Sequence, residues 1–103
     1  MIKVSVMYPH TEGAKFDLDY YLKQHMPLVK RKCGPALRGA TVDKGVAGGA
    51  PGAAAAYVCI GHLMFDSVDA FQKTMAAAGK ELMGDIPNFT TIQPVMQISE
   101  IVM

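Results

Sequence analysis

The chain has 103 residues, of which 50% are hydrophobic, and its ten basic and nine acidic residues leave a net charge of +1. A length of this order suits one small domain, so we expect a single unit over residues 1–103, and the near-neutral charge argues against electrostatic binding to nucleic acid or to an acidic membrane surface. No apolar run approaches the roughly 20 residues of a membrane span, the first six residues lack the layout of a secretory signal, and two distant cysteines make no disulfide framework, so we expect a cytoplasmic protein.

Alternating apolar residues predict the first strand over residues 2–8, with one face formed by Ile2, Val4, Val6 and Tyr8. Pro9 and Gly13 indicate a polar loop after it. Asp17 can cap a following helix, because its carboxylate can accept a bond from a free backbone N–H group. Apolar residues then recur at helical spacing as far as Gly34, at Leu18, Leu22, Met26, Val29 and Cys33, and an adjoining stripe is formed by Tyr21, His25 and Leu28.

Pro27 interrupts this helical pattern, since a proline inside a helix would remove the hydrogen bond to the carbonyl of Lys23. We expect either a kink or a break, with a second short helix beginning at Pro27. Either outcome leaves His25 next to irregular backbone, from which its side chain could be aimed at a ligand.

Residues 36–44 are expected to form the second strand and residues 57–65 the third. Between them, residues 45–56 are almost all glycine and alanine, and we interpret them as a flexible hairpin loop, either a plain surface loop or a lid over a pocket. Ser67 caps a second helix, which Gly84 is expected to end and whose apolar face is Val68, Phe71, Met75, Ala78 and Leu82. Residues 85–90 are a turn-rich link, and residues 94–102 alternate again as the last strand.

The elements follow the order βαββαβ. With right-handed crossovers this order predicts an α+β, ferredoxin-like fold, in which a four-stranded antiparallel sheet carries both helices on one face. The other face would be uncovered in a monomer, and its side chains would include Lys3, Ser5, Met7, Val95, Gln97 and Ser99. Packing the open sheets of two copies together would cover this face, so we expect a homodimer with two-fold symmetry.

His25 is the leading candidate for chemistry, because an imidazole can accept or release a proton near neutral pH. Tyr21 lies one helical turn before it on the same side, so its phenol could bind a carbonyl or phenolate oxygen beside the imidazole. The alternative is structural: His25 would cap backbone freed by Pro27, and Tyr21 would only pack against its neighbours.

Three further polar residues could contact a ligand, although each also has an ordinary structural role. His62 could orient a ligand if it faces a cavity between subunits, or it could be a hydrogen-bonded histidine of the sheet. Asp85 and Asn88 could reach the mouth of a pocket, and both are also typical turn residues.

No sequence motif indicates a metal or an organic cofactor, so we expect neither. There is no glycine-rich phosphate loop and no paired Cys-x-x-Cys, and on a strand Cys59 and His62 would point to opposite faces. A haem iron bound by His25 and His62 is an alternative that rests on those two side chains alone.

Residues 16–28 contain the run F-D-x-x-Y-Y-x-x-x-H-x-P-L, which resembles the EthD family, and the segments 61–67 and 84–90 are also similar to that family. The resemblance covers essentially the whole chain and carries over Asp17, Tyr20, Tyr21, His25, Pro27, Asp85 and Asn88. It implies a dimeric α/β barrel in which two ferredoxin-like subunits pack sheet to sheet. EthD takes its name from bacterial degradation of ethyl tert-butyl ether, some fungal relatives are linked to decarboxylation or dehydration of aromatic polyketides, and many enzymes of the wider superfamily work without a cofactor.

Two hypotheses of function follow. In the first, the cavity of each subunit binds a small apolar or aromatic carbonyl compound, His25 abstracts a proton next to the carbonyl, and Tyr21 or Tyr20 hydrogen-bonds the developing oxyanion. Isomerisation, cyclisation or decarboxylation could follow from that step. In the second, the protein is a non-catalytic ligand-binding or accessory protein of an oxidative degradation pathway. An oxygenase is a third possibility, but no residue identifies an oxygen-activating group.

Overall fold

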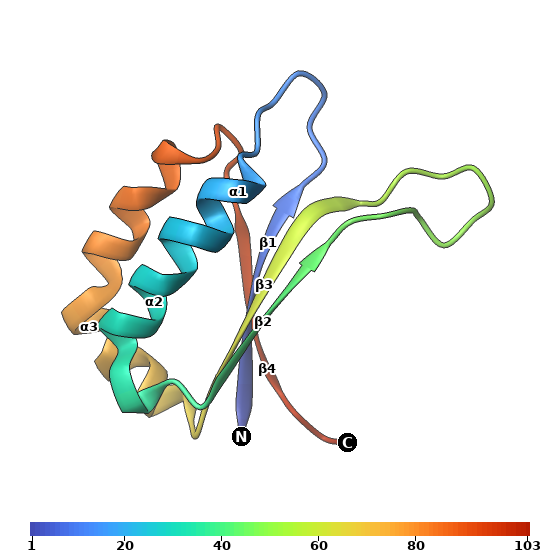
Figure 1. Ribbon diagram of the computed structural model, residues 1–103. Helices are drawn as coiled ribbons and strands as arrows, with labels where there is room; N and C mark the ends of the chain where they lie inside the picture. Colours follow the sequence, from blue (N-terminus) through green and yellow to red (C-terminus); the bar gives the residue numbers. More distant parts are fainter.

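The computed structural model describes residues 1–103 and contains one four-stranded antiparallel sheet with the strand order β2-β3-β1-β4 (Figure 1). The strands are β1 (Ile2–Pro9), β2 (Gly39–Lys44), β3 (Tyr57–Phe65) and β4 (Val95–Glu100). The helical elements are α1 (Leu18–Tyr20), η1 (Tyr21–His25), α2 (Met26–Cys33), η2 (Gly34–Ala36), α3 (Val68–Asp85) and η3 (Ile86–Asn88). The predicted βαββαβ order and the ferredoxin-like fold are confirmed.

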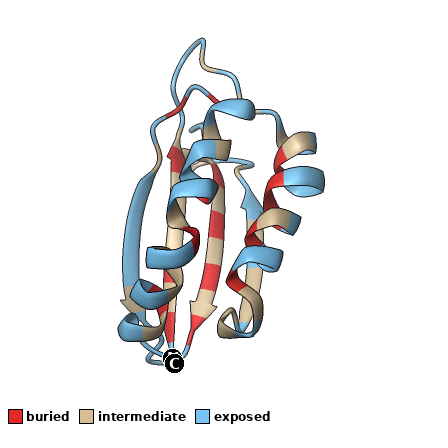
Figure 2. Ribbon diagram, turned by 90° about the vertical axis from the view of Figure 1, so that its left-hand side faces the viewer, coloured by how far each residue is buried: buried red, intermediate tan, exposed pale blue.

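The core lies between one face of the sheet and the layer formed by α2 and α3. Along β1 and β3 the buried residues alternate with partly exposed ones, as the period of a strand requires. Figure 2 shows the buried positions as red bands along strands that lie behind the two helices. None of the helices combines the length and the apolar character that a membrane crossing needs.

The segment from Leu18 to Cys33 is three helical pieces rather than one. A carboxylate oxygen of Asp17 accepts the backbone N–H of Tyr20 at 3.0 Å and starts the first turn, α1. A π-helical turn, η1, follows, and α2 then begins at Met26 with Pro27 in its first turn. Proline is tolerated there because a first-turn N–H has no partner within the helix. The helical pattern is therefore irregular just before Pro27, as expected, but the irregularity is a π-helical turn and the following helix begins at Met26 rather than at Pro27.

Several element ends differ from the sequence prediction: β1 extends to Pro9, and β4 covers only Val95–Glu100 of the expected residues 94–102. β2 begins at Gly39, later than expected, because η2 occupies residues 34–36. α3 continues past Gly84 and ends at Asp85, which we had expected in a turn. This extra residue fixes Asp85 to the rigid end of a long helix.

The second face of the sheet carries no helix. The strand register sets Lys3, Ser5 and Met7 of β1 beside Met64, His62 and Ile60 of β3 on this face. The glycine- and alanine-rich segment 45–56 is a hairpin loop that projects away from the helices (Figure 1).

Candidate functional site

The His25 side chain pairs with Asp85 across the gap between the first helical segment and α3. The His25 Nδ1 atom and a carboxylate oxygen of Asp85 are 2.9 Å apart, and the two side chains are only 8% and 12% exposed. His25 makes no capping bond to the backbone near Pro27, so the expected alternative of a capping role is wrong, and the partner of its side chain is Asp85.

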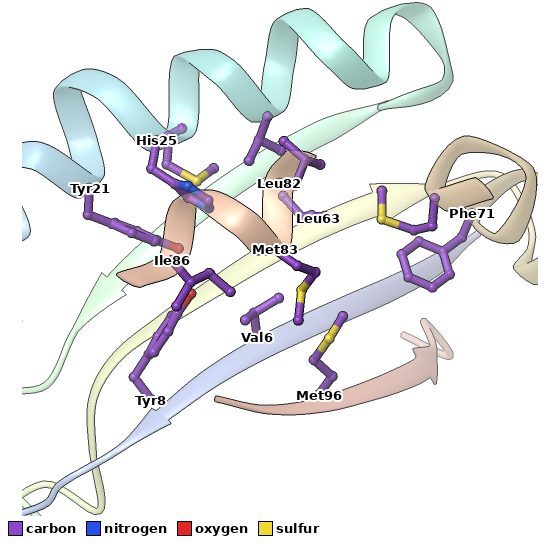
Figure 3. Close-up of a pocket in the computed structure, with 14 residues that line it drawn as sticks. Val6, Tyr8, Tyr21, His25, Leu63, Phe71, Leu82, Met83, Ile86 and Met96 are labelled. Carbon is purple, nitrogen blue, oxygen red and sulfur yellow. The ribbon is translucent and has the colours of Figure 1, made fainter. Parts of the chain in front are cut away.

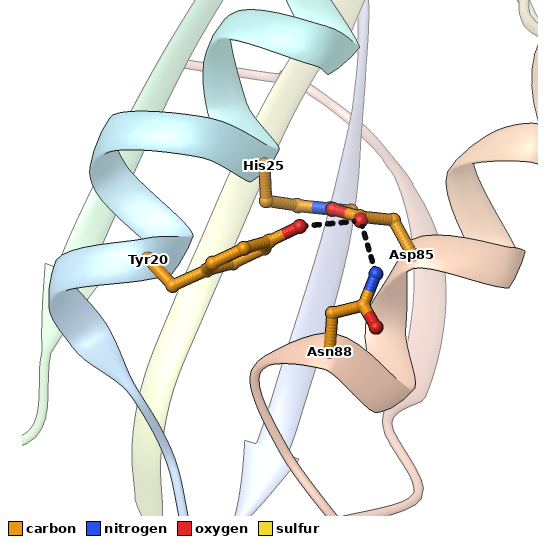
Figure 4. Close-up of polar contacts among 4 residues, drawn as sticks. All are labelled: Tyr20, His25, Asp85 and Asn88. Carbon is orange, nitrogen blue, oxygen red and sulfur yellow. Dashed lines mark hydrogen bonds and ion pairs between the residues drawn. The ribbon is translucent and has the colours of Figure 1, made fainter.

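Two more side chains converge on the same carboxylate (Figure 4). The Tyr20 hydroxyl donates to Asp85 Oδ1 at 2.8 Å, and the Asn88 amide donates to the same oxygen at 2.9 Å. Asp85 therefore accepts three hydrogen bonds, and the structure brings four of the predicted site residues into one network. In this network Asp85 holds the imidazole of His25 directly, and Tyr20 and Asn88 hold the carboxylate of Asp85.

The hydrogen bonds set the protonation of this network. Burial raises the pKa of Asp85, but the bonds from Asn88, His25 and Tyr20 lower it by more, so the pKa of Asp85 lies below its ordinary value. An ionised carboxylate only accepts hydrogen bonds, so Nδ1 of His25 must be the donor. In the neutral imidazole the Nε2 atom then carries the free lone pair, which is the arrangement of a proton acceptor.

Tyr21 packs flat against the imidazole from the other side. The two rings are nearly parallel, 21° apart, with centroids separated by 5.4 Å. Phe89 packs against both rings: its ring centroid lies 5.1 Å from that of Tyr21 and 4.7 Å from that of His25. The π-helical turn places Tyr21 and His25 on one buried face, and the aromatic packing fixes the direction of the imidazole.

A cavity of about 50 Å³ lies between the helices and the sheet, next to His25 (Figure 3). Its lining comes from η1, α2, α3, η3, β1, β3 and β4. Among the lining side chains, oxygen or nitrogen occurs only in His25, Tyr8 and Tyr21. All other lining residues are apolar or glycine, so the cavity is suited to an apolar compound with one polar end.

The remaining predicted site residue, His62, lies on the other face of the sheet. Its Nδ1 atom is 3.0 Å from the Ser5 hydroxyl, and its Nε2 atom is 2.9 Å from a carboxylate oxygen of Asp43. His62 does not line the His25 cavity, and it shares no site with Cys59, which is buried toward the helices. No residue of the loop 45–56 lines that cavity either, so the loop is not its lid.

Sequence reasoning missed three features of the cavity. Tyr8 was identified only as a strand residue of the apolar face, yet its hydroxyl group reaches the cavity. Gly61 lies directly under the Tyr21 hydroxyl, where a side chain would collide with it. Met83 and Met96 stand at the edge of the cavity, 51% and 44% exposed. The position of Tyr8 on the apolar face of β1 could have indicated its role. The positions of Gly61, Met83 and Met96 could not be predicted without the register of the sheet and the path of α3.

The chain as a whole is similar to several known proteins. The EthD domain model matches residues 9–93. An EthD-like protein from Ralstonia eutropha JMP134 is 51% identical, with a TM-score of 0.94, and the match covers 99% of this chain and 92% of that one. An ethyl tert-butyl ether D (EthD) family protein from Bacillus halodurans C-125 is 22% identical over 99% of both chains, with a TM-score of 0.68.

A dimeric ferredoxin-like protein of unknown function from Thermobifida fusca YX has the same fold, with 14% identity and a TM-score of 0.62 over 97% of this chain and 90% of that one. The comparison with curated proteins gives no match.

Proposed function

The chain belongs to the EthD family, and from that premise we propose that its cavity binds a small apolar or aromatic carbonyl compound and that His25 removes a proton from it without a cofactor. The observation that carries the proposal is the His25–Asp85 pair at the wall of an apolar cavity. A cytoplasmic setting suits this chemistry and the two free cysteines.

His25 has the three properties that a general base needs. Its Nδ1 atom is held by an ionised carboxylate, its ring is clamped between Tyr21 and Phe89, and its Nε2 atom makes no hydrogen bond within the protein. No fully buried side-chain nitrogen or oxygen is left without a partner, so the free Nε2 atom opens onto accessible space. The negative charge of Asp85 would stabilise the imidazolium that forms when the base accepts a proton.

The proposed step is balanced without any co-reactant. The bond between an α-carbon and its hydrogen breaks, the proton goes to Nε2 of His25, and the electron pair forms an enolate whose charge rests on the carbonyl oxygen. A hydrogen-bond donor beside that oxygen, of which Tyr21 is the expected one, stabilises the charge. In a β,γ-unsaturated ketone, return of the proton from Nε2 to the γ-carbon gives isomerisation. In a molecule with a second carbonyl group, attack of the enolate carbon on that group gives cyclisation, and the new alkoxide oxygen takes the proton from Nε2.

The size of the cavity indicates how a ligand enters. Benzene is accepted by a protein cavity of about 150 Å³, and the space here is only about 50 Å³. Met83 and Met96 are flexible side chains at its edge, so their movement can open it between α3 and β4 (Figure 3).

We also propose that the protein is a homodimer that packs through the open face of the sheet. Met7, Ile60 and Met64 give that face apolar material, and its strand backbone has no helix to cover it. The description of the Thermobifida fusca protein as dimeric supports this arrangement.

Exchange of α-hydrogens in deuterium oxide tests the proposal. A panel of aromatic and apolar methyl ketones is incubated with the wild-type protein, and deuterium incorporation is followed by proton NMR. We expect exchange that saturates with ketone concentration and falls at least about 100-fold in His25→Gln, the scale of general-base catalysis. His10→Gln is the matched control, because His10 is an exposed loop residue outside the cavity.

Equal exchange in His25→Gln and in the wild type would overturn the role of His25. Saturable binding of several ketones with no exchange above the buffer rate would favour the second hypothesis, a ligand-binding or accessory protein. Circular dichroism of His25→Gln checks that the variant is folded.

A further inference from the structure

We propose that Tyr8 and Tyr21 together form a two-donor site for an oxyanion, so that the preferred ligands of the cavity are phenols and carbonyl compounds that form enolates. This inference rests on the proposed function, because it names the group that receives the negative charge. It assigns a ligand-binding role to Tyr8, which lies in β1, outside the helical segment that carries His25.

Neither tyrosine hydroxyl is used by the protein itself. Tyr8 and Tyr21 are 1% and 2% exposed, and neither hydroxyl makes a hydrogen bond with another group of the chain, although no fully buried polar side-chain atom is left unpaired. Both hydroxyls therefore reach accessible space, and both residues line the same cavity. A buried phenol without a partner gains more from a polar ligand atom than an exposed one does.

The two hydroxyls belong to one end of the cavity. The rings meet edge to face with centroids 5.9 Å apart, and Figure 3 shows both oxygen atoms directed inward. Gly61 is the floor beneath the Tyr21 hydroxyl, and its lack of a side chain is what admits that oxygen. His25 stacks on Tyr21, so a ligand oxygen on the two phenols would leave the neighbouring carbon near the imidazole.

Burial keeps both phenols in the donor form. It is the largest cause that raises the pKa of Tyr8 and of Tyr21 above the ordinary value, so both remain protonated across the physiological range. A neutral phenol can donate to an anionic oxygen, and a bond to a charged acceptor is about twice as strong as a neutral one. Two such donors in an apolar cavity favour an oxyanion over a neutral group of the same shape.

Binding of 4-nitrophenol tests the inference without any turnover. The affinity of the protein for 4-nitrophenolate is measured at a pH above the pKa of free 4-nitrophenol. It is compared with the affinity for nitrobenzene, which has the same nitro group and ring but lacks the phenolate oxygen. We expect Tyr8→Phe and Tyr21→Phe each to weaken 4-nitrophenolate binding by about 10- to 150-fold, the range for one charge-assisted hydrogen bond. Nitrobenzene binding should change less than about threefold. Tyr57→Phe is the matched control, since Tyr57 does not line the cavity.

Equal losses for both ligands in Tyr8→Phe would show that Tyr8 only packs, and an unchanged affinity for 4-nitrophenolate would show that its hydroxyl is not used. Either result, or a wild-type protein that does not bind 4-nitrophenolate saturably, overturns the inference. The His25→Gln variant separates it from the proposed function, because the two-donor site should still prefer 4-nitrophenolate when the base is gone. If His25→Gln loses hydrogen exchange but still prefers 4-nitrophenolate to nitrobenzene, both the general base and the two-donor site are supported. If His25→Gln keeps hydrogen exchange, only the role of His25 as the base is overturned.

Discussion

One added methyl group at Gly61 tests whether the Tyr21 hydroxyl lies where the structure places it. A Cβ built on Gly61 would overlap that oxygen, and the Tyr21 ring cannot easily move aside, because it packs against Tyr8, Phe16 and Phe89. We therefore expect Gly61→Ala to lower the free energy of unfolding by about 1–3 kcal/mol, the usual range for overpacking a core. In a domain of this size each kcal/mol corresponds to roughly 4–8 °C in Tm.

The Tyr21→Phe background should reverse the sign of this effect. With the oxygen removed, the nearest ring atom, Cζ, lies 3.7 Å from the added carbon, which is ordinary van der Waals contact. Burial of one methyl group there is worth up to about 0.8 kcal/mol, so Gly61→Ala becomes neutral or slightly stabilising. The two substitutions should therefore be coupled by about 1–4 kcal/mol.

Urea unfolding of the four proteins, at one fixed protein concentration, measures this coupling as a double-mutant cycle. If Gly61→Ala lowers the free energy of unfolding as much in the Tyr21→Phe background as in the wild type, the position of the Tyr21 hydroxyl is refuted, and with it the two-donor site.

Three further predictions concern pH, ligand entry and assembly. Folding lowers the pKa of Asp85, so the contribution of its carboxylate to stability is complete above the ordinary pKa of 3.8 and is lost as the pH falls through the lower folded value. The difference in unfolding free energy between wild type and Asp85→Asn should therefore narrow as the pH falls below 3.8, and a difference that stays constant there contradicts the network. Met96→Ala should raise the association rate of 4-nitrophenolate several-fold in stopped-flow measurements. Val95→Ala, at the next residue on the other face of β4, should not change that rate, and an equal rate in Met96→Ala and the wild type would exclude ligand entry at that edge. Ile60→Lys should convert a sheet-to-sheet dimer to monomer in analytical ultracentrifugation, and an unchanged mass would place the interface elsewhere.

The fold could be predicted because its signals are local. The alternation along residues 2–8 and the helical spacing that starts at Val68 each fix one element and its buried face, and the order of elements leaves few topologies. The π-helical turn could not be predicted, since no local pattern distinguishes it from an α-helix broken by Pro27.

Some residues of the candidate site could be named from the sequence, and what could not be predicted depends on long-range contacts. His25, Tyr20, Asp85 and Asn88 were each named, but Asp85 lies 60 residues after His25, and only the tertiary structure shows that they are hydrogen-bonded. The interpretation of Asp85 as a turn residue also failed to anticipate that α3 extends through Gly84. Tyr8 was missed because its place in an apolar strand pattern hides the hydroxyl that reaches the cavity.

The central claim is that His25 presents the lone pair of Nε2 to the cavity. Nitrogen-15 NMR of the imidazole, assigned by comparison with His25→Gln and recorded at a pH where the ring is neutral, measures this directly. The account predicts a protonated Nδ1 bonded to Asp85, an unprotonated Nε2, and a change in the Nε2 resonance when a phenol enters the cavity. A neutral ring with its proton on Nε2 would contradict the account, because the cavity would then face a donor instead of a base.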